Sequence, residues 1–228
     1  MTASMKNILT KILDYHRFFG ASREAPKIFC IGMNKTGTTS LNQVFIDMEF
    51  KVGDQRSAEK LLRAYVQKNY DPIIKYCRTA QVFQDVPFSL PETYIHLDQH
   101  FPNSKFILSV RDSAEQWYKS ITTFHAKKFG CGEQPSSQQL MEATYVYKGW
   151  AWESMVACFN VEESAPYDMA KLKGTYNAHN RNVIDYFKNR PNDLLVVNLA
   201  EKNSLEQFVK FVGIKTEINS FPWKNRTQ

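Results

Sequence analysis

Hydrophobic and polar positions along the chain follow two alternating patterns. Short continuous apolar runs lie at about 27–32, 81–85, 105–110 and 194–198. Such runs are typical of strands that are buried on both faces. Between them, apolar residues recur every three or four positions, which is the spacing of one face of a helix. Strands that alternate with helices predict an α/β fold in which helices cover a central parallel sheet.

The helical patterns also give approximate element boundaries. Asp168 is a suitable N-cap for one of the longest patterns, and Gly213 is a suitable stop for the last one. The segment 126–138 contains glycine, proline and serine, and it is predicted to be a loop over the site. The expected helices span about 4–18, 38–49, 56–76 (as one or two helices), the residues after Pro91, 114–124, 138–158, 168–189 and 203–212.

Length and composition set the scale of the molecule. The chain has 228 residues, of which 43% are hydrophobic and 14% aromatic, so we expect one domain over 1–228 with a lead helix in 1–20. The longest apolar runs stay short of the 18 residues that a membrane span needs. The amphipathic N-terminal segment lacks the continuous apolar region of a signal peptide. We therefore expect no transmembrane segment and a cytoplasmic location.

Cysteines and charge narrow the choice of chemistry. The four cysteines lie far apart without a C-x-x-C pair, so a zinc site is not indicated and a reducing compartment fits. The formal net charge of +6 would suit nucleic acid, an anionic membrane or a small polyanion. The basic residues are scattered and form no arm or dense run. A nucleic-acid partner is therefore not expected.

Residues 32–41 read GMNKTGTTSL and lie between the first apolar run and a helical pattern. A strand, a glycine-containing loop and a helix start form a cradle for phosphate, because backbone N–H groups and the helix dipole both favour an anion there. Gly32 and Gly37 allow the backbone to approach a ligand closely. Hydroxyl donors at the helix start are Thr38, Thr39 and Ser40. The segment therefore predicts a site for a nucleotide phosphate.

The lysine of this loop decides between kinds of phosphate chemistry. A Walker A loop reads G-x-x-x-x-G-K-[ST], but here Thr38 occupies the lysine position and the lysine stands upstream, at Lys35. The order Lys-Thr-Gly-Thr-Thr resembles the loop with which sulfotransferases bind the 5′-phosphosulfate of 3′-phosphoadenosine 5′-phosphosulfate (PAPS). The resemblance implies that PAPS is bound by Lys35, Thr36, Gly37, Thr38, Thr39 and Ser40.

A second constellation follows the third apolar run. Arg111 stands at its carboxyl end, where ligands of parallel sheets bind, and a planar guanidinium suits phosphate. Ser120 comes nine residues later, on the next helical pattern. The pair resembles the sulfotransferase motif for the 3′-phosphate, in which the serine commonly follows after eight residues. The alternative is that Arg111 pairs with a carboxylate, either Asp112 or Asp85.

The resemblance to PAPS-dependent sulfotransferases extends from about 27 to 226. The segment 101–112, FPNSKFILSVRD, is similar to members of the superfamily, and 221–225 resembles their closing Phe-Pro-x-x-Asn segment. The resemblance implies a P-loop-like, three-layer fold whose parallel sheet has four or five strands. In cytosolic sulfotransferases a late basic loop holds the 3′-phosphate. By analogy Lys224, Asn225 and Arg226 would do so here, the alternative being a solvated basic tail.

Sulfuryl transfer requires a stabilised leaving phosphate and a base for the acceptor proton. Lys35 suits the first task as a mobile point charge. Asp85 follows the second apolar run, at the sheet edge where the family places its base; alternatively it pairs with Lys35 or Arg111, or caps the turn before Pro87. His125 is the other candidate base. The third run leads into an arginine and not into a Walker B carboxylate, so no metal is expected to be required.

The sequence leaves the acceptor open among small molecules, glycans and lipids, and it leaves the oligomeric state open. Aromatic residues near 126–138 would suit an acceptor pocket, the alternative being a place in the core. They are Trp117, Tyr118, Tyr145, Tyr147, Trp150 and Trp152. We therefore expect a PAPS-dependent sulfotransferase that releases 3′-phosphoadenosine 5′-phosphate (PAP). The rivals are a P-loop kinase or NTPase with a displaced lysine and a catalytically silent PAP- or nucleotide-binding protein.

Overall fold

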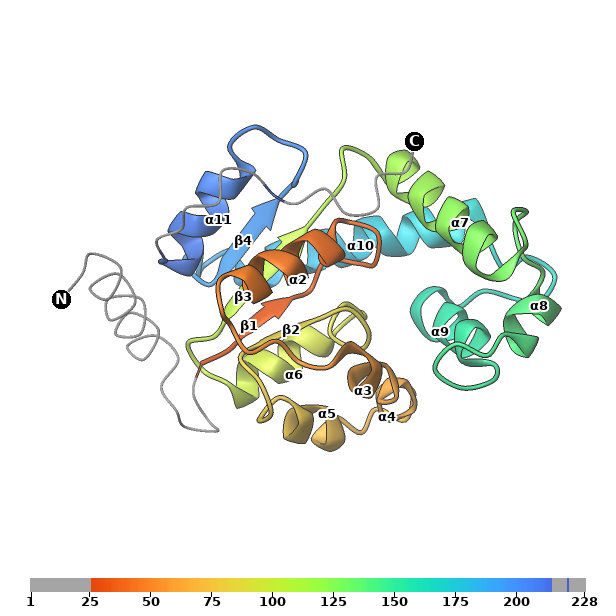
Figure 1. Ribbon diagram of the computed structural model, residues 1–228, viewed down its shortest axis with the longest axis horizontal. Helices are drawn as coiled ribbons and strands as arrows, with labels where there is room; N and C mark the ends of the chain where they lie inside the picture. The colour runs from red at the N-terminus through yellow and green to blue at the C-terminus, as the bar shows by residue number, and fades with distance from the viewer. Residues whose placement is uncertain (1–25, 215–220, 222–228) are drawn as a thin grey trace.

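The computed structural model describes residues 26–214 and Phe221. Within this part of the chain, a sheet of four parallel strands has the order β2-β1-β3-β4 (Figure 1). The strands are β1 (Ile28–Cys30), β2 (Val82–Gln84), β3 (Lys105–Ser109) and β4 (Leu194–Val197). The predicted α/β fold with a parallel sheet is confirmed. The predicted lead helix in 1–20 lies outside the described residues, as do Lys224, Asn225 and Arg226.

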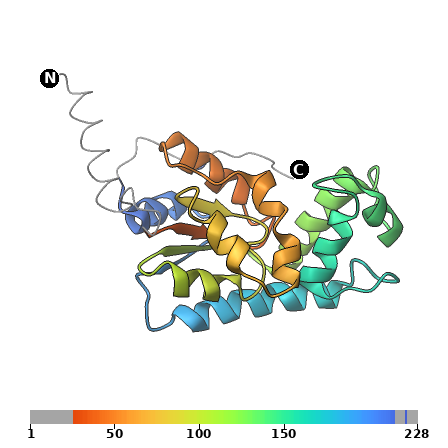
Figure 2. The ribbon, with the colours of Figure 1, turned by 90° about the horizontal axis from the view of Figure 1, so that it is seen from below.

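Helices cover both faces of this sheet, and Figure 2 shows the resulting three layers. Ile28 and Cys30 of β1 face a cluster that includes α2 (Thr38–Asp47) and α11 (Ser204–Val212). Phe29 faces the opposite cluster, which includes the helices α6 (Thr93–His100) and α10 (Met169–Phe187). All three residues of β1 are buried. A strand covered on both sides needs apolar residues at every position, which explains the continuous run in the sequence.

Phe29 lies at the centre of an aromatic cluster beneath the carboxyl edge of the sheet. Its ring centroid lies 5.4 Å from that of Phe106 and 6.2 Å from that of Phe88. Phe88 belongs to the segment that follows β2, so the cluster ties this segment to the central strands. Removing a buried phenylalanine side chain typically costs about 3–5 kcal/mol. The packing therefore fixes the backbone on which the polar residues of the sheet edge stand.

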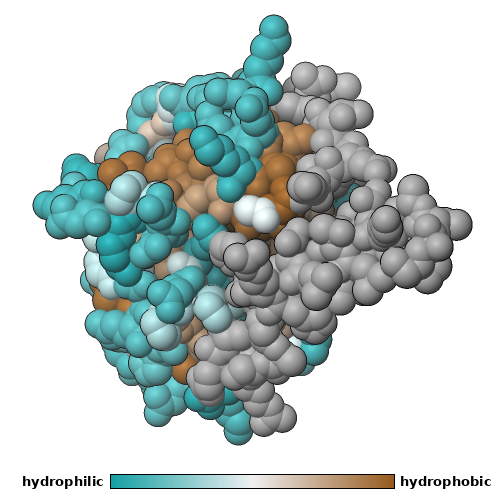
Figure 3. Space-filling view, turned by 90° about the vertical axis from the view of Figure 1, so that its left-hand side faces the viewer, coloured by the Kyte–Doolittle hydropathy of each residue, from teal (hydrophilic) through white to brown (hydrophobic). Residues whose placement is uncertain are grey.

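A further group of helices covers the carboxyl ends of the strands. It comprises α7 (Ala114–Phe129), α8 (Ser137–Glu142), α9 (Trp150–Phe159) and the first half of α10. These helices share their own hydrophobic cluster, which Met33 joins from the loop after β1. In Figure 1 the group α7–α9 lies on the side of the molecule away from α11. The opposite end shows an apolar area among hydrophilic residues (Figure 3).

Several helices differ from their predicted extents. The pattern over 56–76 was expected to form one or two helices, but it forms α3 (Gln55–Glu59), α4 (Leu62–Val66) and α5 (Asp71–Tyr76). Lys68, with φ 53°, turns the chain after α4, and Pro72 lies in the first turn of α5. The helix α7 continues to Phe129, because the first helix breaker is Gly130.

The predicted helix over 138–158 is also wrong, because the chain forms the two helices α8 and α9 there. Gly149 adopts φ 85° between them, a left-handed conformation that ends any continuous helix. The intervening segment brings Tyr145 to the inside of the molecule. Among the described residues, the helices are too short or too polar for a membrane span.

Candidate active site

The loop between β1 and α2 has two positions at which any side chain would clash or be strained. A Cβ on Gly32 would collide with Ser109 of the neighbouring strand β3. Gly37 adopts φ 105°, and a Cβ there would collide with Leu199. The first glycine lets β1 and β3 approach, and the second lets the loop turn into the helix. The backbone is therefore shaped for close approach to a ligand.

The N-terminus of α2 presents backbone hydrogen-bond donors that the described residues leave unused. The amides of Ser40 and Leu41 donate to the Gly37 carbonyl at 2.9 and 3.1 Å, so the amides of Thr38 and Thr39 precede the first helical bond. The first turn contains no acidic residue. Free amides and the positive end of the helix dipole together attract an anion. This end of α2 has the features of the predicted phosphate cradle.

Thr36 and Ser40 are placed differently from the other residues of the motif. The Thr36 hydroxyl donates to the Met33 carbonyl at 2.7 Å and lies 2.6 Å from the Ser109 hydroxyl. Both Thr36 and Ser40 are buried, and neither lines the cavity described next. The side chain of Thr36 therefore ties the loop to β3. Its predicted contact with a cofactor stays a prediction, as does that of Ser40.

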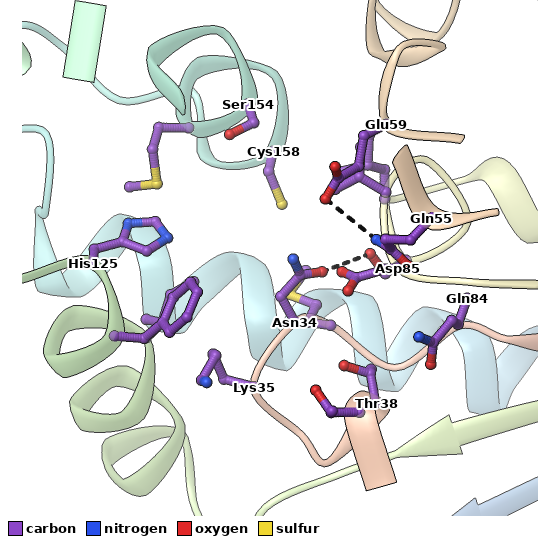
Figure 4. A pocket seen from close by; sticks show the side chains of 18 of the residues that line it. Asn34, Lys35, Thr38, Gln55, Glu59, Gln84, Asp85, His125, Ser154 and Cys158 are labelled. Carbon is purple, nitrogen blue, oxygen red and sulfur yellow. Dashed lines mark hydrogen bonds between the residues drawn. The ribbon is translucent and has the colours of Figure 1, made fainter. Parts of the chain in front are cut away.

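A cavity of about 400 Å³ opens above this loop, at the carboxyl edge of the sheet (Figure 4). Its walls come from the loop, the segment after β2, and the helices α3, α7 and α9. Residues far apart in the sequence meet here. The lining includes the sequence-predicted residues Lys35, Gly37, Thr38, Thr39, Asp85, Arg111 and His125.

Lys35 is a half-buried cation at the base of the cavity. Its Nζ lies 4.1 Å from the centroid of the Phe124 ring, a cation–π contact. Burial lowers the pKa of Lys35, the nearby Arg111 lowers it further, and Asp85 opposes both effects. Among the described residues, no carboxylate forms an ion pair with Lys35. A bound anion would therefore stabilise the charged form of the Lys35 side chain.

Arg111 stands at the end of β3, as predicted, and is anchored on two sides. Its amide donates to the Tyr176 hydroxyl at 2.9 Å, and its Nε donates to the Lys35 carbonyl at 2.7 Å. Asp112 does not pair with it, because the Asp112 carboxylate accepts hydrogen bonds from Asn198 and Gln116. Within the described part of the chain, the Nη atoms of Arg111 form no hydrogen bond. They are available to a ligand.

Ser120 lies on α7 with 7% of its surface exposed. Its Oγ has no hydrogen-bond partner among the described residues. A buried hydroxyl that lacks a partner costs about 1–3 kcal/mol, so such groups commonly serve a ligand. Ser120 does not line the cavity itself. Its predicted contact with the 3′-phosphate stays a prediction.

Asp85 lies directly after β2, in a left-handed conformation with φ 64°. Its Oδ1 is enclosed and has no hydrogen-bond partner among the described residues. Burial raises the pKa of Asp85 to about 7, the Glu59 carboxyl raises it as well, and the Lys35 ammonium opposes the rise. A carboxyl group in this state exchanges protons near neutral pH. It forms no ion pair with Lys35 or Arg111 in the described structure.

His125 faces the cavity from α7, opposite Asp85 (Figure 4). Its Nδ1 lies 2.8 Å from the Tyr167 hydroxyl. Burial and the nearby Lys35 ammonium lower the pKa of His125 to about 4. The imidazole is therefore neutral at pH 7, but it is a much weaker base than a free histidine.

The sequence did not point to Glu59, which lines the same cavity together with Gln55. Glu59 is 4% exposed although it is a carboxylic acid. A polar pair four residues apart beside Ala58 and Leu62 is a weak signal, because it also describes an ordinary surface helix. Ser154 and Cys158 of α9 were likewise missed, and Figure 4 shows them at the far side of the cavity from the loop.

Three of the six candidate aromatic residues line the cavity: Trp117, Tyr145 and Trp150. They also have structural roles. The indole N–H of Trp117 donates to the Asn34 carbonyl at 3.0 Å, and that of Trp150 donates to the Glu59 carbonyl at 2.9 Å. The two interpretations of these residues, as core and as pocket lining, therefore both apply. Tyr118, Tyr147 and Trp152 do not line the cavity.

The fold and the site define a P-loop-like α/β protein with a cradle for an anionic group beside a pair of titratable side chains. A family profile described as the sulfotransferase domain matches residues 27–228. The chain therefore belongs to this family, and the resemblance found in the sequence is confirmed. The family is one of transferases, which supports sulfuryl transfer in general. A search of curated proteins finds no significant match to the chain.

Proposed function

We propose that the protein transfers a sulfuryl group from PAPS to a hydroxyl or amine of an acceptor and releases PAP. The family supports the type of reaction. The observation that supports the donor is the cradle itself. Lys35, the N-terminus of α2 and the Nη atoms of Arg111 offer positive charge and donors that the described residues leave unused.

The residues at the site fit PAPS chemically. The loop amides, Lys35, Thr38 and Thr39 would hold the 5′-phosphosulfate. Arg111 and the unpartnered Ser120 hydroxyl would hold the 3′-phosphate. Lys224, Asn225 and Arg226 remain proposed ligands of the same phosphate, from outside the described residues. The donor set consists of cations and N–H or O–H groups, as a multiply charged anion requires.

When bound, PAPS supplies an electrophilic sulfur, which bonds to the acceptor oxygen or nitrogen as its bond to the phosphate oxygen breaks. Lys35 holds the negative charge that develops on the phosphate side. We assign the acceptor proton to the Asp85 carboxylate, because its pKa of about 7 makes it the stronger base. His125, with a pKa of about 4, is the weaker candidate and orients the acceptor from the opposite wall.

The cavity supports a small acceptor or the end of a larger one. Its volume of about 400 Å³ is within the range of small-ligand sites. Aromatic and apolar side chains form much of the wall, and a few polar groups converge on the space above Lys35. A hydroxyl of a small molecule, or of a glycan or lipid terminus, would meet Asp85 in this space.

Calorimetric titration of the purified protein with PAP, and in parallel with ATP and Mg²⁺, tests the donor. We expect micromolar binding of PAP and weaker binding of ATP. Preference for ATP would overturn the proposal and favour the kinase or NTPase. Transfer of radiolabelled sulfate from PAPS to a panel of phenols, sugars and lipids then tests turnover. Binding of PAP without any transfer would favour a silent binding protein.

A further inference from the structure

We propose that Glu59 is a positioning residue of the active site, which acts on the base Asp85 through its charge and through Gln55. The inference rests on the proposed function, because it takes Asp85 as the proton acceptor. Figure 4 shows Gln55 between Glu59 and Asp85, with all three side chains at one wall of the cavity. The proposed function uses neither Glu59 nor Gln55, so these two residues need an explanation of their own.

Gln55 lies next to both carboxyl groups and forms a hydrogen bond with one of them. Gln55 Nε2 donates to Glu59 Oε1 at 3.3 Å. The Gln55 side chain also lies beside Asp85 at this wall of the cavity (Figure 4). Gln55 and Glu59 stand four residues apart on α3, so they project from the same face of the helix. The bond holds the Glu59 carboxyl and the Gln55 amide in a fixed relation to each other, next to Asp85.

Hydrogen bonds to other parts of the fold hold α3 in place. A helix of five residues has little stability of its own, so its position must come from such contacts. The Gly53 amide donates to the Val82 carbonyl of β2 at 2.9 Å, and the Tyr76 hydroxyl donates to the Asp54 carbonyl at 2.7 Å. The indole of Trp150 donates to the Glu59 carbonyl at 2.9 Å. These bonds aim Gln55 and Glu59 at the residue that follows β2.

The burial of Glu59 is the feature that a purely structural role does not explain. A buried carboxylate is costly unless it is paired. Arg56 Nη1 lies 3.1 Å from Glu59 Oε2, but the Arg56 side chain is 45% exposed, which weakens the pair through solvent screening. The Tyr145 hydroxyl donates to Glu59 Oε1 at 3.4 Å, a long hydrogen bond. An apolar residue at this position would avoid the cost altogether.

The negative charge of Glu59 affects the pKa of the proposed base, Asp85. The charged groups that shift the pKa of Asp85 are Glu59 from α3 and Lys35 from the loop, and Asp85 in turn raises the pKa of Tyr145 from the segment before α9. Glu59 raises the pKa of Asp85, whereas the Lys35 ammonium and the neighbouring Gln55 amide lower it. A bound anion at Lys35 would offset the effect of this lysine. The pKa of Asp85 would then rise when the donor is present.

Carbon-13 NMR of protein labelled at the aspartate carboxyl carbons measures the titration of Asp85. It therefore tests the effect of Glu59 on Asp85 without any acceptor. The Asp85 signal is the one that disappears in Asp85→Asn. In Glu59→Gln we expect the midpoint of the Asp85 titration to fall by about half a pH unit or more, because a buried negative charge is removed. The matched control is Glu153→Gln, which removes a carboxylate paired with Arg63 outside the cavity and should leave the midpoint unchanged.

A second variant keeps the proposal testable even if Glu59→Gln does not fold. Gln55→Leu removes the amide that lowers the pKa of Asp85 and leaves the Glu59 charge, so the midpoint should rise instead of fall. Opposite shifts in the two variants are the result that the proposal requires. An unchanged midpoint in folded Glu59→Gln, or a fall in Gln55→Leu, would overturn it. Circular dichroism of each variant establishes that it is folded.

The pH profile of transfer gives a separate readout. In Glu59→Gln the acid limb of kcat/KM should move to lower pH, which raises the rate on that limb about threefold relative to the plateau for a shift of half a pH unit. Glu59→Asp, which keeps the charge, should restore the profile. A Glu59→Gln profile identical to the wild type would contradict the proposal. The NMR midpoints could shift as expected while the protein transfers sulfate to none of the acceptors. That result would refute the proposed function but not the effect of Glu59 on the pKa of Asp85.

Discussion

The Nε of Arg111 donates a hydrogen bond to the backbone carbonyl of Lys35 at 2.7 Å, which joins the two cations of the site. Arg111 follows β3, and Lys35 belongs to the loop between β1 and α2. The bond therefore fixes the loop against the end of the neighbouring strand. It occupies only one side of the guanidinium, so the Nη atoms can still bind a phosphate.

Replacing Arg111 tests its assignment to the 3′-phosphate. Arg111→Ala should weaken PAP binding by about 1.5–3 kcal/mol, the range for a lost hydrogen bond to a charged group. Arg111→Lys keeps the charge but loses the planar fork, so it should recover only part of the affinity. Calorimetry measures both. The control is Arg63→Ala, an arginine paired with Glu153 away from the cavity. Unchanged affinity in Arg111→Ala would contradict the assignment.

Lys35→Ala should reduce the rate of transfer by about 100-fold or more, because it removes the cation that stabilises the leaving phosphate. The fold should stay intact, since the side chain is only half-buried and pairs with no carboxylate in the described structure. Single-turnover transfer from PAPS gives the rate. Lys127→Ala on α7 serves as control, because Lys127 is close enough to lower the pKa of Lys35 but does not line the cavity. Near-normal transfer in Lys35→Ala would disprove its role.

The pH dependence of wild-type kcat/KM separates the two candidate bases. If Asp85 is the base, activity requires its deprotonated form, so the rate should rise with pH and reach half of its plateau near pH 7. If His125 is the base, the same limb should lie near pH 4. Asp85→Asn should remove most of the activity over the whole range, by about 100-fold or more. A limb near pH 4 that is retained in Asp85→Asn would transfer the role to His125.

Two glycine substitutions test the backbone of the cradle. Gly37→Ala forces a side chain into a left-handed conformation and against Leu199, so it should destabilise the protein by about 1–3 kcal/mol. Gly174→Ala lies inside α10, where a Cβ meets no neighbouring atom, and it should stabilise the protein by about 0.5–1 kcal/mol. Thermal unfolding measures both. Equal effects of the same sign would show that the loop does not depend on its glycine.

The sequence predicted the sheet well because the central strands β1 and β3 are buried on both faces, and the edge strands β2 and β4 also have continuous apolar runs. The helices α3, α4 and α5 were harder to predict. Each is short, and α3 is held by bonds from Tyr76 and Trp150, which are distant in the sequence. Local pattern contains no information on such contacts. The segment was therefore read as longer helices.

The same limit applies to the site. Lys35, Arg111 and Asp85 could be found because each follows a strand, and parallel strands end at one edge of the sheet. Glu59 could not be found, since nothing in its neighbourhood shows that α3 turns it towards Asp85. The motif also does not reveal whether the Thr36 hydroxyl is available to bind a ligand. Only the structure shows that its hydroxyl contacts Ser109 and Met33.

The separate hydrophobic cluster of α7, α8 and α9 has a consequence for how such proteins diversify. The cradle is built on the sheet, whereas the opposite wall of the cavity, with Ser154 and Cys158, stands on α9, much of which packs in this second cluster. Substitutions on that wall change the shape of the acceptor space without disturbing the strands that position Lys35 and Arg111. A lineage with this architecture can change that wall of the cavity one side chain at a time while the anion cradle stays constant.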